Sequence, residues 1–276
     1  MHWGGIDEYR IFTKGNKMAA KVLIWDIETA PILGYTWGLF DQNIGLNQIQ
    51  KDWHLLSWSA KWLGEKGVMY MDQRKSKDIT NDKKILQELW KLLDQADIVV
   101  TQNGKKFDQK KVNARFIFHG MTPPSSFKHI DTCALAKKHF GFTSNKLAYM
   151  TDKLNTKYKK LEHGNFPGFE LWKECLKGNL KAWKEMEKYN KHDVLSLEEL
   201  YLKLIPWDGT VNFSLYYDND LQTCSCGCKE FKHIGFHYTP TGKYQRFRCK
   251  KCGKEGRLNK NLFTKEKRDS LHRNTR

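Results

Sequence analysis

The sequence lacks the long apolar run that would carry a chain across a membrane. No stretch reaches the roughly 18 consecutive apolar residues that a membrane-spanning helix needs. The first seventeen residues carry Asp7 and Glu8 and contain no apolar stretch, so they differ from a secretory signal peptide. We therefore expect a cytoplasmic protein with no membrane partner.

Acidic residues are scarce relative to basic ones. Lys and Arg number 48 against 31 Asp and Glu, which gives a net charge of +17. The excess is concentrated in residues 223–276, which hold fifteen basic and four acidic residues. A segment of this charge gains free energy when it neutralises phosphates and releases their counterions. This favours a nucleic-acid partner, and the alternative is a basic surface that serves only solubility.

Cysteine is nearly absent outside one region. Five of the seven cysteines lie between residues 224 and 252. An odd number with this clustering fits a local metal site better than a disulfide framework. Cys133 and Cys175 are isolated, and we expect them to be ordinary, partly buried thiols.

The pattern of apolar residues predicts an α/β domain. An apolar, β-branched run at 21–26 suits a strand that is buried on both faces. Residues 82–94 have helical spacing, and a strand pattern at 98–101 follows them. Further strands are predicted at 35–37 and 55–62, a strand end at 129–132, and helices at 107–118, 134–139, 147–154 and 181–204.

The same pattern sets the expected boundaries. Pro206 and Gly209 end the long helix and the domain that contains it. We expect an N-terminal arm at 1–20, the α/β domain at 21–205, a linker at 206–222, a zinc ribbon at 223–257 and a basic tail at 258–276.

Asp26 and Glu28 form the first candidate site. Residues two apart on a strand point to the same side, so both carboxylates would reach a common cation. The apolar run before Asp26 makes this a buried strand that ends in two acids, which is costly unless a metal or partner compensates. The alternative is a solvated strand end.

Two further segments supply acids. Asp108 follows the turn at Asn103 and Gly104, at the carboxyl end of a predicted strand, where α/β sheets commonly place ligand sites. It would also suit the N-terminal dipole of a helix. Tyr189 and Asp193 lie four residues apart on the long helix and share one face, which is also common for surface pairs.

These segments together resemble the three exonuclease motifs of the DnaQ-like (DEDD) family of 3′-to-5′ exonucleases. The elements Asp-x-Glu, Asn-(four residues)-Asp and Tyr-x-x-x-Asp occur in that order. Lys188 stands where the histidine branch of the family carries His, so the chain resembles the tyrosine (DEDDy) branch. The resemblance covers residues 21–205 and implies a ribonuclease H-like domain, with a central mixed sheet flanked by helices.

The resemblance also implies an activity. It assigns two Mg²⁺ or Mn²⁺ ions to Asp26, Glu28, Asp108 and Asp193, and it gives Tyr189 the role of orienting the attacking water. Carboxylate oxygens suit these hard cations. The implied reaction is 3′-to-5′ hydrolysis of single-stranded ends, with DNA favoured as partner.

The lack of a polymerase module makes the chain similar to exonucleases encoded by bacteriophages. The alternatives are an exoribonuclease of the same family and a catalytically silent nucleic-acid-binding protein. Any replication or repair partner is left open.

A second metal site is predicted near the C-terminus. The pairs Cys224/Cys226 and Cys249/Cys252, each followed by Gly, indicate a structural site for one Zn²⁺ with four cysteine ligands. Cys228 would replace one of the first pair if the register shifted.

Two predicted strands between the cysteine pairs, at 235–238 and 243–248, would form a hairpin. Alternation places Tyr244, Arg246 and Arg248 on one face, with Lys250 nearby. Such a face would stack on bases and hold phosphates. The alternative is a charged face that keeps a small module soluble.

Overall fold

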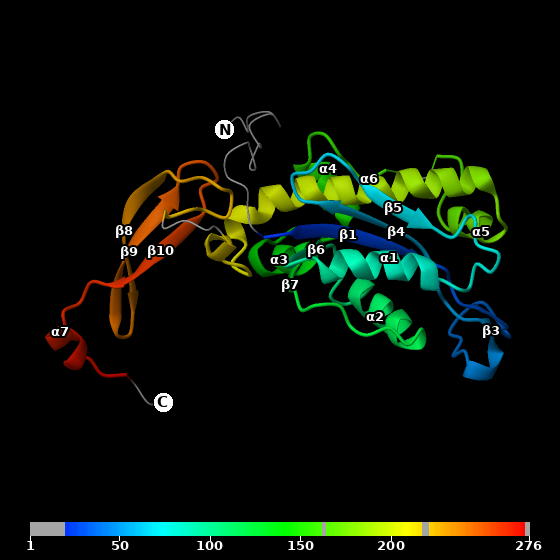
Figure 1. Cartoon of the computed structure of the whole chain (residues 1–276), viewed down its shortest axis with the longest axis horizontal. Coiled ribbons are helices and arrows are strands. Elements are labelled where there is room, and N and C mark those ends of the chain that lie inside the picture. Colours follow the sequence, from blue (N-terminus) through cyan, green and yellow to red (C-terminus); the bar gives the residue numbers. More distant parts are fainter. Residues whose placement is uncertain (1–19, 162–163, 217–220, 274–276) are drawn as a thin grey trace. The chain divides into compact units, whose positions relative to one another are not determined.

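The computed structural model describes residues 20–161, 164–216 and 221–273 (Figure 1). Most of the expected N-terminal arm therefore lies outside the described residues, as do residues 217–220 of the expected linker and the last three residues of the tail. The described chain forms two compact units. One comprises Ala20–Lys203, and the other begins at Leu204.

A five-stranded mixed sheet forms the centre of the first unit. Its strand order is β5-β4-β1-β6-β7. The strand β1 pairs antiparallel with β4 and parallel with β6, so the predicted mixed sheet is confirmed. The strands are β1 (Val22–Thr29), β4 (Leu55–Trp62), β5 (Met69–Asp72), β6 (Ile98–Thr101) and β7 (Lys128–Asp131).

Helices cover both faces of this sheet (Figure 1). On one face, Leu23 and Trp25 of β1 pack in one core with Leu89 of α1 and Phe116 of α2. Full burial of such side chains stabilises the fold by about 1.5–3 kcal/mol each. The helices of the unit are α1 (Lys83–Asp94), α2 (Asp108–Phe118), α3 (Thr132–His139), α4 (Leu147–Leu154), α5 (Glu170–Leu176) and α6 (Leu180–Leu204).

The other face of the sheet is covered by α5 and α6. A second core joins Leu56 of β4 to Leu171 and Cys175 of α5 and to Trp183 of α6. Because β1 is buried on both faces, its apolar run continues without polar interruption as far as Trp25. The strand then runs on through both acids to Thr29, which makes it longer than predicted.

The strand predicted at 35–37 is wrong. A two-stranded sheet forms instead from β2 (Leu33–Gly34) and β3 (Ile49–Lys51), with the short helix η2 (Leu46–Gln48) before β3. Trp37 is 96% exposed, so these aromatic residues do not pack on the central sheet. Aromatic residues favour strands only where neighbours cover them.

The second unit contains a three-stranded antiparallel sheet with the order β10-β9-β8. The predicted hairpin is present as β8 (Phe231–Thr239) and β9 (Gly242–Cys249). The third strand, β10 (Glu255–Asn261), was not predicted and extends past residue 257. The unit also contains η3 (Ile205–Trp207), η4 (Phe213–Tyr216) and α7 (Lys265–Asp269). No helix in the described ranges combines the length and apolar character needed to span a membrane.

Candidate metal centres

The four predicted acids lie together at one end of β1. Carboxylate oxygens of Asp26, Glu28 and Asp193 all lie within 4.8 Å of one another. Asp108, at the start of α2, accepts a hydrogen bond of 3.3 Å from the backbone N–H of Ile27, between the two β1 acids. We refer to these four side chains as the acid site. Three elements that are remote in sequence therefore meet there.

Burial and mutual repulsion raise the pKa values of the acid site. Burial raises the pKa of Asp26 well above its ordinary value, and Asp108, Glu28 and Asp193 raise it further. The pKa of Glu28 rises to about 8, mainly because of burial and then because of Asp193. Burial raises the pKa of Asp108 to about 6. This cluster of buried and half-buried carboxylates is therefore poorly compensated by the protein alone.

The acid site has the properties expected of ligands for a divalent cation. Oδ1 of Asp193 is buried, and it has no hydrogen-bond partner among the residues that the structure describes. The donors are all oxygen, which matches the preference of Mg²⁺ and Mn²⁺. The residues present therefore fit such metals.

Neighbouring side chains hold two of the acids in place. The indole N–H of Trp172 donates to Oε2 of Glu28 at 3.1 Å. The amide of Asn190 donates to Oδ2 of Asp26 at 2.8 Å and accepts from Ser57 at 3.3 Å. Such second contacts fix the direction in which ligand oxygens point.

Tyr189 borders the acid site from α6, four residues before Asp193. It is 8% exposed, and its ring meets the edge of Trp172 with 6.1 Å between ring centroids. Burial raises the pKa of Tyr189, and Asp193 and Glu28 raise it further, so its phenol keeps its proton at neutral pH. His192, its neighbour on the helix, contacts the backbone carbonyl of Lys159 instead.

Lys160 is a site residue that sequence reasoning missed. Its Nζ lies 2.6 Å from Oδ2 of Asp193 and 4.6 Å from the centre of the Tyr189 ring. Burial lowers the pKa of Lys160, but the neighbouring Asp193 carboxylate and Tyr189 raise it overall. The residue lies between α4 and α5, and nothing in the local sequence separates it from the nearby Lys157 and Lys159.

The turn before Asp108 depends on its glycine. A Cβ added at Gly104 would lie 2.3 Å from Oγ1 of Thr101, which is too close for any other residue without a shift of the backbone. Asn103 has φ 62°, and its N–H donates to Asp131 at 2.9 Å. The end of β6 is therefore folded tightly, and it delivers Asp108 to the acid site.

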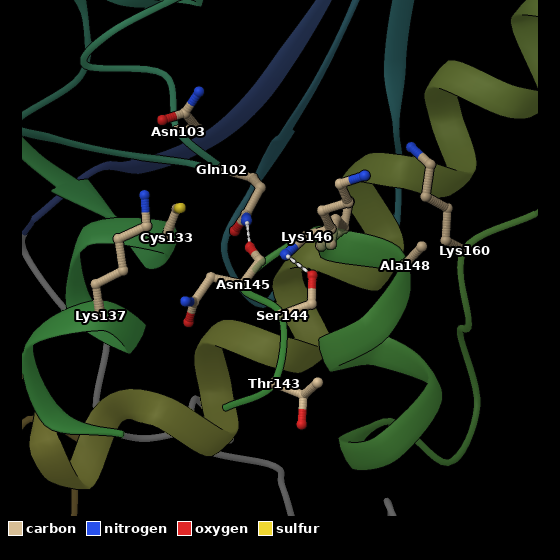
Figure 2. Close-up of a pocket in the computed structure, with 11 residues that line it drawn as sticks. Gln102, Asn103, Cys133, Lys137, Thr143, Ser144, Asn145, Lys146, Ala148 and Lys160 are labelled. Carbon is tan, nitrogen blue, oxygen red and sulfur yellow. Dashed lines mark hydrogen bonds between the residues drawn. The ribbon is translucent and has the colours of Figure 1, made fainter. Parts of the chain in front are cut away.

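A cavity adjoins the acid site through Lys160. Figure 2 shows Gln102, Asn145 and Lys146 around it, and Gln102 donates to the carbonyl of Asn145 at 2.9 Å. The cavity has a volume of about 530 Å³. Lys137, Lys146 and Lys160 line it, and none of the described lining residues is acidic. Its lining would therefore attract an anion.

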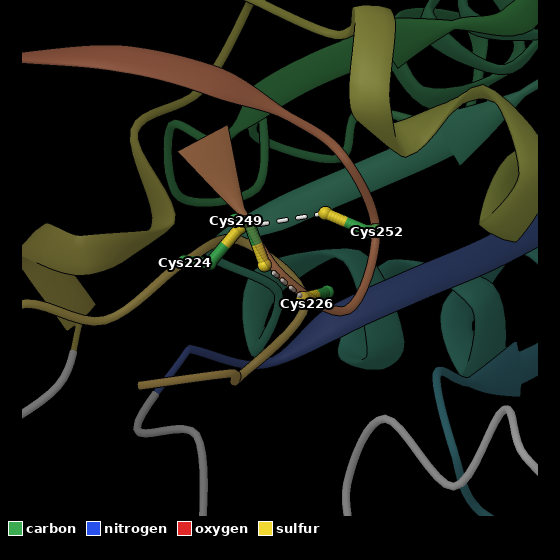
Figure 3. A group of neighbouring side chains, drawn as sticks. All are labelled: Cys224, Cys226, Cys249 and Cys252. Carbon is green, nitrogen blue, oxygen red and sulfur yellow. Dashed lines mark hydrogen bonds between the residues drawn. The ribbon is translucent and has the colours of Figure 1, made fainter. Parts of the chain in front are cut away.

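The second unit brings four cysteines together (Figure 3). The sulfur atoms of Cys224 and Cys252 are 3.6 Å apart, as are those of Cys226 and Cys249. Zinc–sulfur bonds of about 2.3 Å in a tetrahedron place neighbouring sulfurs about 3.8 Å apart, so this cluster fits a zinc ion. The sulfur of Cys228 contacts the backbone N–H of Glu230 at 3.3 Å and lies outside the cluster.

Two similar turns present these cysteines. Gly227 and Gly253 both have φ 76°, a conformation that favours glycine. The N–H of Gly227 donates to Cys224 at 2.8 Å, and that of Gly253 donates to Cys249 at 3.0 Å. Both cysteine pairs therefore sit on tight backbone turns that expose N–H groups near the sulfurs.

One face of the three-stranded sheet carries most of the residues that the sequence predicts to contact nucleic acid. Tyr244, Arg246 and Arg248 alternate along β9, and Arg257 of β10 lies opposite Arg246. The guanidinium of Arg257, which the sequence did not indicate, lies 3.9 Å from the centre of the Tyr244 ring. We call these four residues the cation face.

Acidic neighbours partly neutralise the predicted cations. Glu255 pairs with Arg248 and lies 4.0 Å from Arg246. Glu230 pairs with Lys250 at 3.3 Å. Lys250 is thus the predicted cation that lies apart from the cation face.

The fold and the acid site define the class of protein, which is a mixed α/β domain with acids gathered at one end of its central strand. A family model for the RNase_H superfamily matches residues 45–205, and the chain belongs to that superfamily. The match includes Asp108 and Asp193 and begins after Asp26 and Glu28. The RNase H-like fold predicted from the sequence is therefore confirmed, and the superfamily supports a nuclease.

Comparison with individual proteins adds little beyond this. No curated protein matches the chain significantly. Among solved structures, the chain is similar to the family B DNA polymerase of the hyperthermophilic archaeon Pyrobaculum calidifontis, at 13% sequence identity with a TM-score of 0.49. The similarity covers 68% of this chain and 25% of the polymerase, so the chain spans about a quarter of that protein.

Proposed function

We propose that this protein is a metal-dependent 3′-to-5′ exonuclease that hydrolyses single-stranded nucleic-acid ends, with DNA favoured over RNA. The observation that carries the proposal is the meeting of carboxylates from β1 and α6 within 4.8 Å, beside the buried Asp108. A cluster of buried and half-buried acids without enough internal compensation is what a cation site requires. Membership of the RNase_H superfamily supports the reaction class.

Asp26, Glu28, Asp108 and Asp193 would hold two Mg²⁺ or Mn²⁺ ions. When bound, such ions supply an activated water and stabilise the leaving oxygen of the phosphodiester. The protein contributes the fixed directions of the ligand oxygens, through the contacts that Trp172 and Asn190 make with Glu28 and Asp26.

Tyr189 and Lys160 would act on the substrate side of the acid site. The protonated phenol of Tyr189 can donate a hydrogen bond to a water or phosphate oxygen. The ammonium of Lys160 is held by Asp193 and reaches the cavity, where it would attract the phosphate of an entering strand. Neither residue needs to change protonation for these roles.

The cavity would receive the end of the strand. Lys137 and Lys146 supply charge to it, and Gln102 and Asn103 supply amide groups to its lining. This arrangement can hold a phosphate and a base edge without depending on sequence. A volume of about 530 Å³ leaves room for one nucleotide.

The second unit would bind one structural Zn²⁺ through Cys224, Cys226, Cys249 and Cys252. The ion stabilises the fold of the small unit when bound. The cation face would then contact the phosphates and bases of the strand. Because Lys250 pairs with Glu230, its contribution to binding should be smaller than that of Arg257.

A test of substrate and polarity uses matched single-stranded DNA and RNA, each labelled at the 5′ end. With Mg²⁺ or Mn²⁺, the account expects a ladder that shortens from the 3′ end, with DNA degraded faster. Faster degradation of RNA would indicate the exoribonuclease alternative. Tight binding with no cleavage under either metal would indicate a silent binding protein and would overturn the proposal.

A further inference from the structure

Segment 32–46 exposes an unusual density of large apolar side chains. Trp37 is 96% exposed and Leu39 is 92% exposed. Soluble monomers rarely expose contiguous apolar patches larger than a few hundred Å². The exposed apolar residues of the segment are Ile32, Leu33, Tyr35, Trp37, Leu39, Phe40, Ile44 and Leu46.

Polar contacts made by Gln48 help to hold this segment in shape. The side chain of Gln48 donates to the carbonyl of Tyr35 at 2.9 Å and accepts from the N–H of Gly45 at 2.7 Å. The backbone N–H of Tyr35 donates to Gln48 at 3.0 Å. These contacts do not use the apolar side chains, whose exposed surface remains available for contact outside the segment.

The charge of the segment argues against a nucleic-acid partner at this surface. Between residues 29 and 50 the only charged residue is Asp41, although the chain carries 48 Lys and Arg in total. A nucleic-acid strand obtains most of its affinity from cations that neutralise its phosphates. Five of the eight exposed apolar side chains are aliphatic and do not stack on bases as aromatic rings do. These properties fit a protein surface that is itself apolar and carries little charge.

We propose that segment 32–46 is a self-association surface that joins two copies of this chain. An apolar segment with a single charged residue, Asp41, is largely complementary to a second copy of itself, as a two-fold interface requires. Contact through basic surfaces would instead bring like charges together, since each copy carries +17. Eight large side chains that are about half to fully exposed offer about 1,000 Å² per copy, against the roughly 800 Å² per partner of a standard interface.

Sedimentation equilibrium of the full chain tests this proposal. The wild type should be a dimer in the micromolar range, and the double substitution Trp37→Ser with Leu39→Ser should weaken dimerisation by about 100-fold or more. The control is Ile117→Ser with Leu215→Ser, which removes apolar side chains of 74% and 79% exposure elsewhere. The control should leave the dimer unchanged.

Three results would overturn the proposal. The first is a wild type that is monomeric at about 100 μM, a concentration well above the micromolar dissociation constant expected for the dimer. The second is a dimer that survives the Trp37 and Leu39 substitutions. The third is unchanged mass with weaker binding to a single-stranded oligothymidine, which would assign the segment to nucleic acid. Equal thermal unfolding of all variants will show that none has failed to fold, because the altered side chains are outside the core.

Discussion

The ammonium of Lys160 lies 2.6 Å from the carboxylate of Asp193, within a cluster that otherwise consists of acids. This contact joins the loop after α4 to α6, across thirty-three residues of sequence. Lys160 brings a positive charge into contact with the acid site, and it lies at the edge of the cavity. We therefore propose that Lys160 acts on a substrate phosphate and does not only stabilise the fold.

The substitution Lys160→Met should lower kcat/KM for single-stranded DNA by about 10- to 100-fold, because a half-buried cation beside developing negative charge is lost. Lys159→Met is the matched control, since the Lys159 ammonium is on the surface and pairs with Asp152 at 3.1 Å. Steady-state kinetics of both variants check the prediction. Equal activities would remove Lys160 from the account.

The stability of the metal-free protein should depend on the charge of Glu28. Burial raises the pKa of Glu28 from 4.5 to about 8. An acid whose pKa is raised by folding binds more protons in the folded state, so stability is lost as pH rises between the two pKa values. We expect the Tm in EDTA to fall between about pH 5 and about pH 8.

Glu28→Gln should flatten this fall, whereas Glu65→Gln, at an exposed position, should not. Excess Mg²⁺ should remove the fall in the wild type, because a metal binds the deprotonated carboxylates. Thermal unfolding at a series of pH values measures both effects. A Tm in EDTA that does not change over this pH range would contradict the claim that folding raises the pKa of Glu28 in the acid site.

Gly104→Ala should damage both stability and activity. The new Cβ would meet Thr101 at 2.3 Å, and relief of this clash moves the turn that carries Asp108. Overpacking of this kind costs about 1–3 kcal/mol. In the control Gly141→Ala the Cβ meets no atom within 4 Å. Chemical unfolding and cleavage assays should show a loss of stability and activity in Gly104→Ala and not in Gly141→Ala. A Gly104→Ala variant with unchanged stability and activity would show that the turn is not needed.

Cysteine substitutions should distinguish ligands from bystanders in the second unit. Cys249→Ser should lower the zinc content from one ion per chain and destabilise the unit, because four thiolates would hold the ion under the proposed function. Cys228→Ser should keep the zinc content and the stability of the unit, since the sulfur of Cys228 contacts Glu230 outside the cluster. Metal analysis of the purified proteins gives the answer. If Cys228→Ser lost zinc, Cys228 would belong to the ligand set in place of Cys224 or Cys226.

The parts of the fold that follow local patterns were predictable. The apolar run of β1 and the helical spacing of α1 and α6 each determine an element without help from distant residues. The acids were found because three short motifs occur together, although each motif alone is common. The order and spacing of such motifs can be read from a single sequence.

Other features depend on contacts that local sequence does not encode. Lys160 reaches the acid site only because the loop after α4 returns to α6. The strand β10 has little apolar alternation and forms by pairing with β9, where Glu255 meets Arg248. Aromatic residues at 35–37 have strand propensity but no sheet to cover them, so the propensity did not decide the outcome.

The central claim is that the acid site performs metal-dependent hydrolysis from the 3′ end. The most direct measurement compares the wild type, Asp26→Asn and the exposed control Asp269→Asn on 5′-labelled single-stranded DNA with Mg²⁺, together with their binding to the same strand. The account predicts a 3′-shortening ladder for the wild type and the control, and no ladder but near-normal binding for Asp26→Asn. A ladder of wild-type intensity from Asp26→Asn would contradict it.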